Sequence, residues 1–152
     1  MGNEESVMPL NSNDVKTSVW GPEMWRRVEQ LIEYCTDTPK GARTVLNTIS
    51  HLDHLLRCSI CRSNYPRTFM AVYDAMTPQI LQNVNKGWLH VMWWTIHNAV
   101  NRRLDKPRYD WSEYARRFPS LVSGKWQAQL SNDDLRLFKR LTHPTFVLGY
   151  FP

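Results

Sequence analysis

Apolar residues return every three or four positions along most of the chain, which is the spacing of one face of an α-helix. The first such stretch follows Pro22, a residue suited to a first helical turn, and reaches Cys35. A second stripe runs from Val45 to Leu56, after a Thr-Pro-Lys-Gly break at 38–41. Alternation of apolar and polar residues is nowhere long enough to predict a strand. The pattern therefore predicts an all-α fold.

The same spacing predicts more helices further along the chain. One starts at a pair of cysteines and covers residues 65–76, with a proline near its first turn. The longest covers residues 80–104 and stops before a Lys-Pro pair, because the residue before a proline is disfavoured in a helix. A short helix is predicted over residues 111–118, and another over 133–141.

The chain is predicted to have three parts. Residues 1–17 are polar and predict a flexible arm. Residues 18–118 form one domain, a small helical bundle with short connections. Residues 119–152 form a C-terminal extension whose apolar tail, HPTFVLGYFP, is expected to dock on the domain or on a second subunit. A chain of 152 residues is long enough to bury a core of its own.

The net charge of +5 favours acidic partners, but the basic residues are dispersed and form no tract, so no nucleic-acid partner is predicted. No signal peptide and no membrane-spanning run is apparent, which predicts a soluble protein of the cytoplasm. The opening Met-Gly-Asn-Glu-Glu-Ser fits the pattern for myristoylation of Gly2. Membrane contact is therefore expected only if Gly2 is acylated.

The chain has three cysteines, of which Cys58 and Cys61 form a C-x-x-C. This spacing places both sulfurs on one turn at the start of a helix, where unpaired N–H groups lower the pKa of a thiol. Arg57 and Arg62 add positive charge on either side. The pair therefore indicates a reversible redox disulfide. The lone Cys35 is expected to be a buried thiol or a link between two subunits.

Two other interpretations of the pair stay open from the residues alone. His51 and His54 precede it, so the segment contains four residues of zinc-ligand type. One continuous helix would spread them over about 15 Å, which is too far for a single metal ion. The third interpretation is a pair of inert structural thiols.

A second motif occupies the end of the longest predicted helix, WLHVMWWTIHNAVNRRLDKP. His97 and Asn101 are four residues apart and face the same way. A flat ring could stack on this aromatic surface, and a pyrophosphate could meet Lys106 and the nearby arginines. A core histidine with capping asparagines is the alternative.

Three motifs together resemble the Erv/ALR family of FAD-dependent sulfhydryl oxidases over about residues 19–118: W-G-P-x-x-W from Trp20, the C-x-x-C, and H-N-x-V-N-x-x-L-x-K-P from His97. The resemblance implies a four-helix bundle plus a short fifth helix, with FAD at the bundle mouth. It implies no metal. The residues it places around the cofactor are Trp20, Gly21, Trp25, Glu29, His97, Asn98, Val100, Asn101, Lys106 and Tyr109.

The resemblance also implies the chemistry. Cys61 would lie next to the flavin, and Cys58 would be the outward partner that meets a thiol protein substrate or a thioredoxin-like shuttle. Two electrons would pass through FAD to O2 and give H2O2. Family members are commonly homodimers, and this chain looks like the compact members encoded by large DNA viruses, which work in the host cytoplasm.

Two departures from the family pattern affect the cofactor site. Glu29 stands where the family has a histidine that contacts the flavin, so affinity or redox potential is expected to differ. Asp105 replaces the glycine before Lys-Pro, which Asp tolerates because it adopts the left-handed conformation better than most residues. The alternatives to an oxidase are a zinc-stapled or basic helical binding module, or an inactive structural protein with the same fold.

Overall fold

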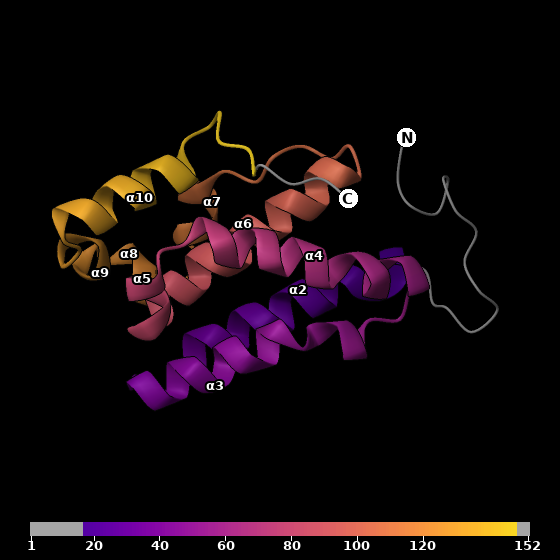
Figure 1. Ribbon diagram of the computed structural model, residues 1–152, viewed down its shortest axis with the longest axis horizontal. Helices are drawn as coiled ribbons and strands as arrows, with labels where there is room; N and C mark the ends of the chain where they lie inside the picture. Colours follow the sequence, from indigo (N-terminus) through magenta and orange to yellow (C-terminus); the bar gives the residue numbers. More distant parts are fainter. Residues whose placement is uncertain (1–16, 149–152) are drawn as a thin grey trace.

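The computed structural model describes residues 17–148, with side chains from Gly21 onward. This part of the chain contains helices and no strand, which confirms the predicted all-α class (Figure 1). Residues 1–16 of the predicted arm, which include the Gly2 motif, and the last four residues of the tail lie outside the described residues. The elements in chain order are α2 (Thr17–Tyr34), α3 (Pro39–Ser50), the 3-10 helix η1 (Leu52–Leu55), α4 (Ser59–Ala75), α5 (Pro78–Gln82), α6 (Lys86–Arg103), α7 (Trp111–Ala115), α8 (Pro119–Val122), α9 (Lys125–Ala128) and α10 (Asn132–Thr142).

Helix α6 is the central element of the bundle and packs against α2, α3 and α4 (Figure 1). Residues 87–96 of α6 are all buried, without interruption. A helix that is buried all round must be enclosed by other elements, since no face of it is left for solvent. The predicted bundle of four long helices followed by a short fifth helix, α7, is thereby confirmed.

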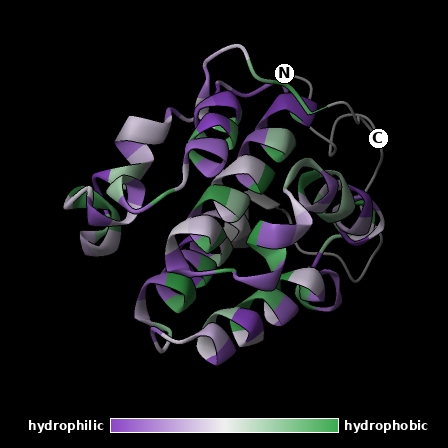
Figure 2. Cartoon of the chain, turned by 60° about the vertical axis from the view of Figure 1, so that its left-hand side comes forward, coloured by the Kyte–Doolittle hydropathy of each residue, from purple (hydrophilic) through white to green (hydrophobic). Residues whose placement is uncertain are grey.

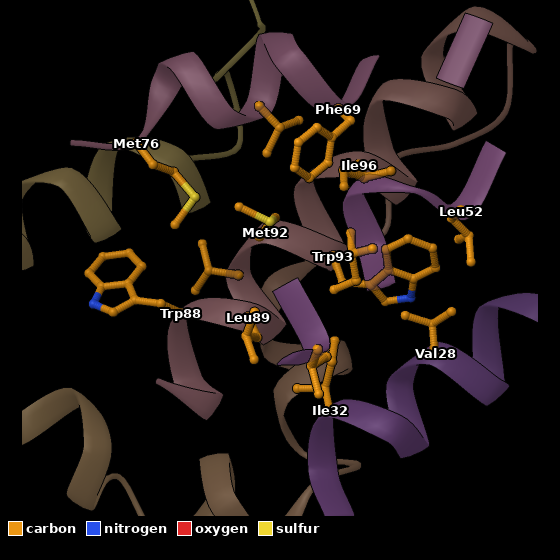
Figure 3. Close-up of a cluster of buried hydrophobic side chains, with 14 of the residues drawn as sticks. Val28, Ile32, Leu52, Phe69, Met76, Trp88, Leu89, Met92, Trp93 and Ile96 are labelled. Carbon is orange, nitrogen blue, oxygen red and sulfur yellow. The ribbon is translucent and has the colours of Figure 1, made fainter. Parts of the chain in front are cut away.

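The core forms where the apolar sides of these helices meet. Figure 3 shows Val28 and Ile32 of α2 directed toward Leu89 and Trp93 of α6, and none of the four is more than 6% exposed. Each such side chain contributes roughly 1.5–3 kcal/mol when fully buried. Figure 2 shows hydrophobic and hydrophilic residues on different sides of the outer helices, as expected for helices that cover a core on one face.

Several helix boundaries differ from the predicted ones, and backbone capping explains two of them. Helix α6 begins at Lys86 because the side chain of Asn85 accepts a hydrogen bond from the Trp88 N–H. Residues 78–82 form the separate short helix α5, capped in the same way by Thr77. The expected single helix over 80–104 was therefore wrong at its start, because an Asn between two apolar segments favours a new N-cap.

Two prolines expected near a first helical turn lie inside their helices instead. Helix α2 already begins at Thr17, so Pro22 lies inside it instead of in its first turn. Pro66 lies within α4 and not near its first turn, because α4 begins at the cysteine pair, as predicted, at Ser59. The second apolar stripe is interrupted after Ser50, where the chain tightens into η1 before the cysteines.

The segment after residue 119 packs on the same core as the bundle. The predicted helix over 133–141 is confirmed as α10, and its residues Leu137 and Phe138 join the core cluster, as does Leu148. Near the start of α6, the Trp126 ring packs against Gly87. A Cβ added to Gly87 would lie 2.1 Å from that ring. The described part of the extension therefore shares one core with α6.

A buried hydrogen-bond network links α2, α6, α7 and α8. His90 has no exposed surface, and burial lowers its pKa from 6.5 to about 4, so its ring is neutral. One ring nitrogen, Nδ1, accepts from the Tyr114 hydroxyl at 2.8 Å, and the other donates to Glu33 at 3.0 Å. Ser120 donates both its N–H and its hydroxyl to Glu33. Each buried polar group of this network thus has a partner.

None of the described helices combines the length and apolarity needed to cross a bilayer.

Candidate active site

The two cysteines of the C-x-x-C lie at the start of α4. Cys58 is the N-cap residue, with extended backbone, and its sulfur accepts a hydrogen bond from the Cys61 N–H at 3.4 Å. A helix therefore begins at the pair, as the spacing predicts. The N–H groups and dipole of that first turn stabilise negative charge on sulfur, which is the electrostatic setting of a reactive thiol.

Both sulfurs belong to the protein interior, contrary to the expectation for Cys58. Cys58 has no exposed surface and Cys61 is 8% exposed. As the N-cap residue, Cys58 folds its side chain back over the first turn, which turns the sulfur away from solvent. Arg57 and Arg62 on either side are exposed, and Arg62 donates to the Leu56 carbonyl at 2.9 Å. A molecule in solvent can therefore reach the Cys58 sulfur only after the chain around it moves.

The four side chains of the zinc interpretation, those of His51, His54, Cys58 and Cys61, do not form one metal site. Among residues 17–148, no three His, Cys, Asp or Glu side chains lie close enough to hold a metal ion. His51 and His54 stack on each other, with ring centroids 6.4 Å apart, and both are exposed, whereas Cys58 and Cys61 are buried. His54 belongs to η1 and His51 precedes it, whereas both cysteines belong to the start of α4.

Trp25 of α2 packs against Trp93 and His97 of α6, and these three rings form an aromatic wall between the two helices. The Trp25 ring stacks on the His97 ring at 3.9 Å with an interplanar angle of 7°, and it meets Trp93 at 4.7 Å. The Trp93 indole N–H also donates to the Trp25 carbonyl at 3.3 Å. The resemblance to the Erv/ALR family implied that Trp25 and His97 belong to one site, and the structure brings them together across 72 positions of the chain, from 25 to 97.

His97 is the polar centre of this wall. Its Nδ1 atom is buried and makes no hydrogen bond within the described part of the chain. Burial, with smaller effects from the charges of Lys106 and Arg117, lowers its pKa from 6.5 to about 4, so the ring is neutral. A buried nitrogen without a partner is costly, and a polar atom of a bound group would satisfy it.

The asparagines of the motif hold the loop that follows α6. Asn98 accepts from the Tyr109 N–H at 2.8 Å and donates to the Tyr109 carbonyl at 3.0 Å. Asn101 donates to the Pro107 carbonyl at 3.3 Å. These amides therefore fix the loop backbone, and through it the positions of Lys106 and Tyr109. Asp105 has a φ of 57°, the left-handed conformation that the sequence led us to expect.

The remaining predicted residues are distributed as follows. Gly21 is buried in α2, and Val100 is half-buried on α6. Lys106 is exposed on the loop. The side chain of Trp20 lies outside the described residues.

Glu29 has a partner that the sequence analysis did not identify. Its carboxylate is 2% exposed and is held by Arg117, at 2.5 Å from Nη2 and 3.4 Å from Nη1. The same Nη1 donates to the Tyr109 hydroxyl at 2.8 Å. Glu29 follows Val28, on the face of α2 that packs into the core. Because a buried carboxylate needs a partner, this position in the sequence indicates a cation from another part of the chain.

Residues 23–119 of this chain match the Erv1/Alr family. The chain belongs to the Erv1/Alr family. The match covers helix α4 with the Cys58–Cys61 pair at its start, the Trp25–His97 wall and the loop to Arg117, and it confirms the family inferred from the three motifs.

Viral sulfhydryl oxidases are among the proteins similar to this chain. The chain is 31% identical over 99 residues to the FAD-linked sulfhydryl oxidase of an African swine fever virus tick isolate from Malawi, a match covering 62% of this chain and 76% of the relative. The FAD-linked sulfhydryl oxidase of an African swine fever virus pig isolate from Kenya is 30% identical over 99 residues, and that match also covers 62% of this chain and 76% of the relative. No solved structure matches the chain significantly.

The described residues fit the cofactor named for these Erv1/Alr relatives. A flat aromatic wall suits a flavin or an adenine, because stacked rings bind flat ligands. The unsatisfied His97 Nδ1 supplies a hydrogen-bonding atom, and Lys106 supplies positive charge near it. The donor set therefore matches a ligand that has both an aromatic ring and phosphates.

Proposed function

We propose that Cys58 and Cys61 form the redox disulfide through which this Erv1/Alr family member oxidises substrate dithiols at the expense of O2. Membership of this family, together with relatives that are FAD-linked sulfhydryl oxidases, identifies a flavin-dependent thiol oxidase with FAD as cofactor. The observation that carries the finer proposal is the position of the pair at the first turn of α4, inside the matched region.

The cofactor would lie at the mouth of the bundle, held by the wall of Trp25 and His97 and by the loop of Lys106. FAD supplies a two-electron acceptor that O2 can reoxidise, which gives H2O2. The neutral His97 ring would offer its Nδ1 atom to the cofactor, and Lys106 would neutralise phosphate charge.

The thiol chemistry starts from the oxidised Cys58–Cys61 pair. A substrate thiolate attacks the Cys58 sulfur, the bond between the two cysteines breaks, and Cys61 leaves as a thiolate. The first turn of α4 stabilises that thiolate electrostatically. A second substrate thiolate then attacks the mixed disulfide and releases Cys58. The substrate has lost two electrons and become a disulfide, and the cysteine pair has gained them.

Access to the pair is the step that the fold controls. Since Cys58 has no exposed surface, the segment between Leu56 and Ser59 must open before a protein thiol can reach it. A small dithiol needs a smaller opening than a protein does. Oxidation of small dithiols is therefore the more direct assay of the pair.

The test is the visible spectrum of the purified protein, with oxygen uptake recorded on adding dithiothreitol. We expect a yellow protein whose flavin absorption bleaches under the dithiol and recovers in air. Cys61→Ser should bind FAD and consume no oxygen, and Cys35→Ser, which alters the cysteine outside the pair, is the matched control. A protein that takes up no FAD would refute the proposal in favour of a binding module. Flavin binding without turnover in the unmodified protein would indicate the inactive structural alternative.

The partners and the assembly belong to the same proposal. The electron donor would be a thiol protein or a thioredoxin-like shuttle in the cytoplasm, and no nucleic acid is involved. A homodimer is proposed, with Cys35 and the C-terminal tail as candidate contacts. Light scattering of wild-type protein and of Cys35→Ser, with and without reductant, tests both the mass and the role of that cysteine.

A further inference from the structure

The carboxylate of Glu29 lies where a helix normally places an apolar side chain. Its neighbours along α2, Val28 and Ile32, are both core residues, and Glu29 itself is only 2% exposed. A buried carboxylate without a partner is strongly destabilising, so its position is meaningful only together with the cation that meets it.

That cation, Arg117, comes from the end of the segment that follows α7 and lies 88 positions away in sequence. Its guanidinium binds both oxygens of Glu29 and also donates to the hydroxyl of Tyr109 at 2.8 Å. It lies over the rings of Tyr114 and Phe118 at 5.8 and 5.0 Å. The planar fork of an arginine can bridge two acceptors in fixed directions, which an ammonium group cannot do.

Tyr109 connects this ion pair to the aromatic wall. Its ring meets the His97 ring edge-on, with centroids 5.7 Å apart and an interplanar angle of 89°. The His97 ring in turn stacks flat on Trp25. The order of contacts is therefore Glu29, Arg117, Tyr109, His97, Trp25, and it runs from the buried charge to the stacked surface.

From this order we infer that Glu29 and Arg117 are positioning residues for the cofactor: the ion pair fixes Tyr109, and Tyr109 fixes the His97 ring against Trp25. The inference rests on the proposed function, because it assigns the wall to FAD. Glu29 acts through Arg117 and needs no contact with the flavin of its own. A preorganised wall strengthens binding because the ring positions are set before the ligand arrives.

The experiment measures the FAD dissociation constant of flavin-free protein by fluorescence titration, together with its thermal midpoint. The variants are Glu29→Gln, Arg117→Lys and Tyr109→Phe. The matched control is Glu23→Gln, which breaks the exposed ion pair of Glu23 and Arg27 on the same helix. Glu29→Gln and Arg117→Lys should each raise the dissociation constant at least tenfold, a change of about 1.4 kcal/mol. The control should leave it unchanged.

The double variant Tyr109→Phe/Arg117→Lys separates a route through Tyr109 from a general loss of stability. Residues that act in one chain of contacts are not additive, so Arg117→Lys should have a much smaller effect when the Tyr109 hydroxyl is already absent. A second readout needs no flavin: the ring protons of His97, which lie against the Trp25 indole, should shift in the NMR spectrum of Glu29→Gln.

Three results would overturn the inference. A lower thermal midpoint with an unchanged FAD dissociation constant would assign the ion pair to folding alone. Fully additive effects of Tyr109→Phe and Arg117→Lys would show that Arg117 acts by another route. Unmoved His97 ring protons in Glu29→Gln would show that the wall does not depend on the pair. Unmodified protein that binds no FAD would instead refute the proposed function, and the inference with it.

Discussion

The stability of the flavin-free protein should fall steeply between pH 7 and pH 5, because two histidines are buried in the neutral form. Burial lowers the pKa of both His90 and His97 from 6.5 to about 4. Below pH 6.5 the unfolded chain binds a proton at each of these side chains, and the folded protein does not until about pH 4. The unfolded state then binds more protons, so the free energy of unfolding decreases as the pH falls.

The magnitude follows from the size of the shift. Since one pKa unit corresponds to about 1.36 kcal/mol, each histidine costs at most about 3.4 kcal/mol once the pH is below 4. At pH 5 only part of this is reached, roughly 2 kcal/mol each and roughly 4 kcal/mol together. That is a large share of the stability of an ordinary domain, which is about 5–15 kcal/mol. Glu33, whose pKa is lowered by hydrogen bonds from Ser120 and His90 against the opposing effect of burial, adds to the loss only at lower pH.

Urea unfolding at pH 7, 6 and 5, followed by circular dichroism, measures this loss directly. His97→Gln should remove about half of the decrease, because His90 still contributes its share. The matched control is His51→Gln, which alters an exposed histidine and should leave the decrease unchanged. A free energy of unfolding that stays level from pH 7 to pH 5, or the same decrease in His97→Gln as in wild type, would refute the reasoning.

Three further substitutions test local packing, backbone strain and the loop that follows α6. Gly87→Ala should lower the free energy of unfolding by about 1–3 kcal/mol, because its Cβ would displace the Trp126 ring, and thermal unfolding measures the loss. Gly124→Ala, at φ +70° with open space around the Cβ, should cost only about 1–2 kcal/mol of backbone strain. A loss below about 1 kcal/mol in Gly87→Ala, or a loss clearly above about 2 kcal/mol in Gly124→Ala, would contradict the packing argument. Asn98→Ala removes both side-chain hydrogen bonds to the Tyr109 backbone and should cost about 1–3 kcal/mol in urea unfolding, with weaker FAD binding; unchanged FAD binding would show that the loop does not need this anchor.

The sequence by itself determined the helices and the start of the site. Period-3.6 spacing gave the long elements, because a helix face is a local property of neighbouring residues. The cysteine spacing placed the pair at a helix start, where α4 does begin. The three motifs were enough to identify the family that residues 23–119 match. Helix ends were less accurate, since an Asn or Thr N-cap can divide one apolar stripe into two helices.

Only the tertiary structure decided which distant side chains meet. The pairing of Glu29 with Arg117, the burial of Cys58, and the Trp126 ring over Gly87 depend on how the chain after α6 folds back on the bundle. Residue spacing within one helix carries no information about that return path. Such contacts are fixed by close packing among all the helices at once, because an interior at crystal-like density leaves each side chain few positions to occupy.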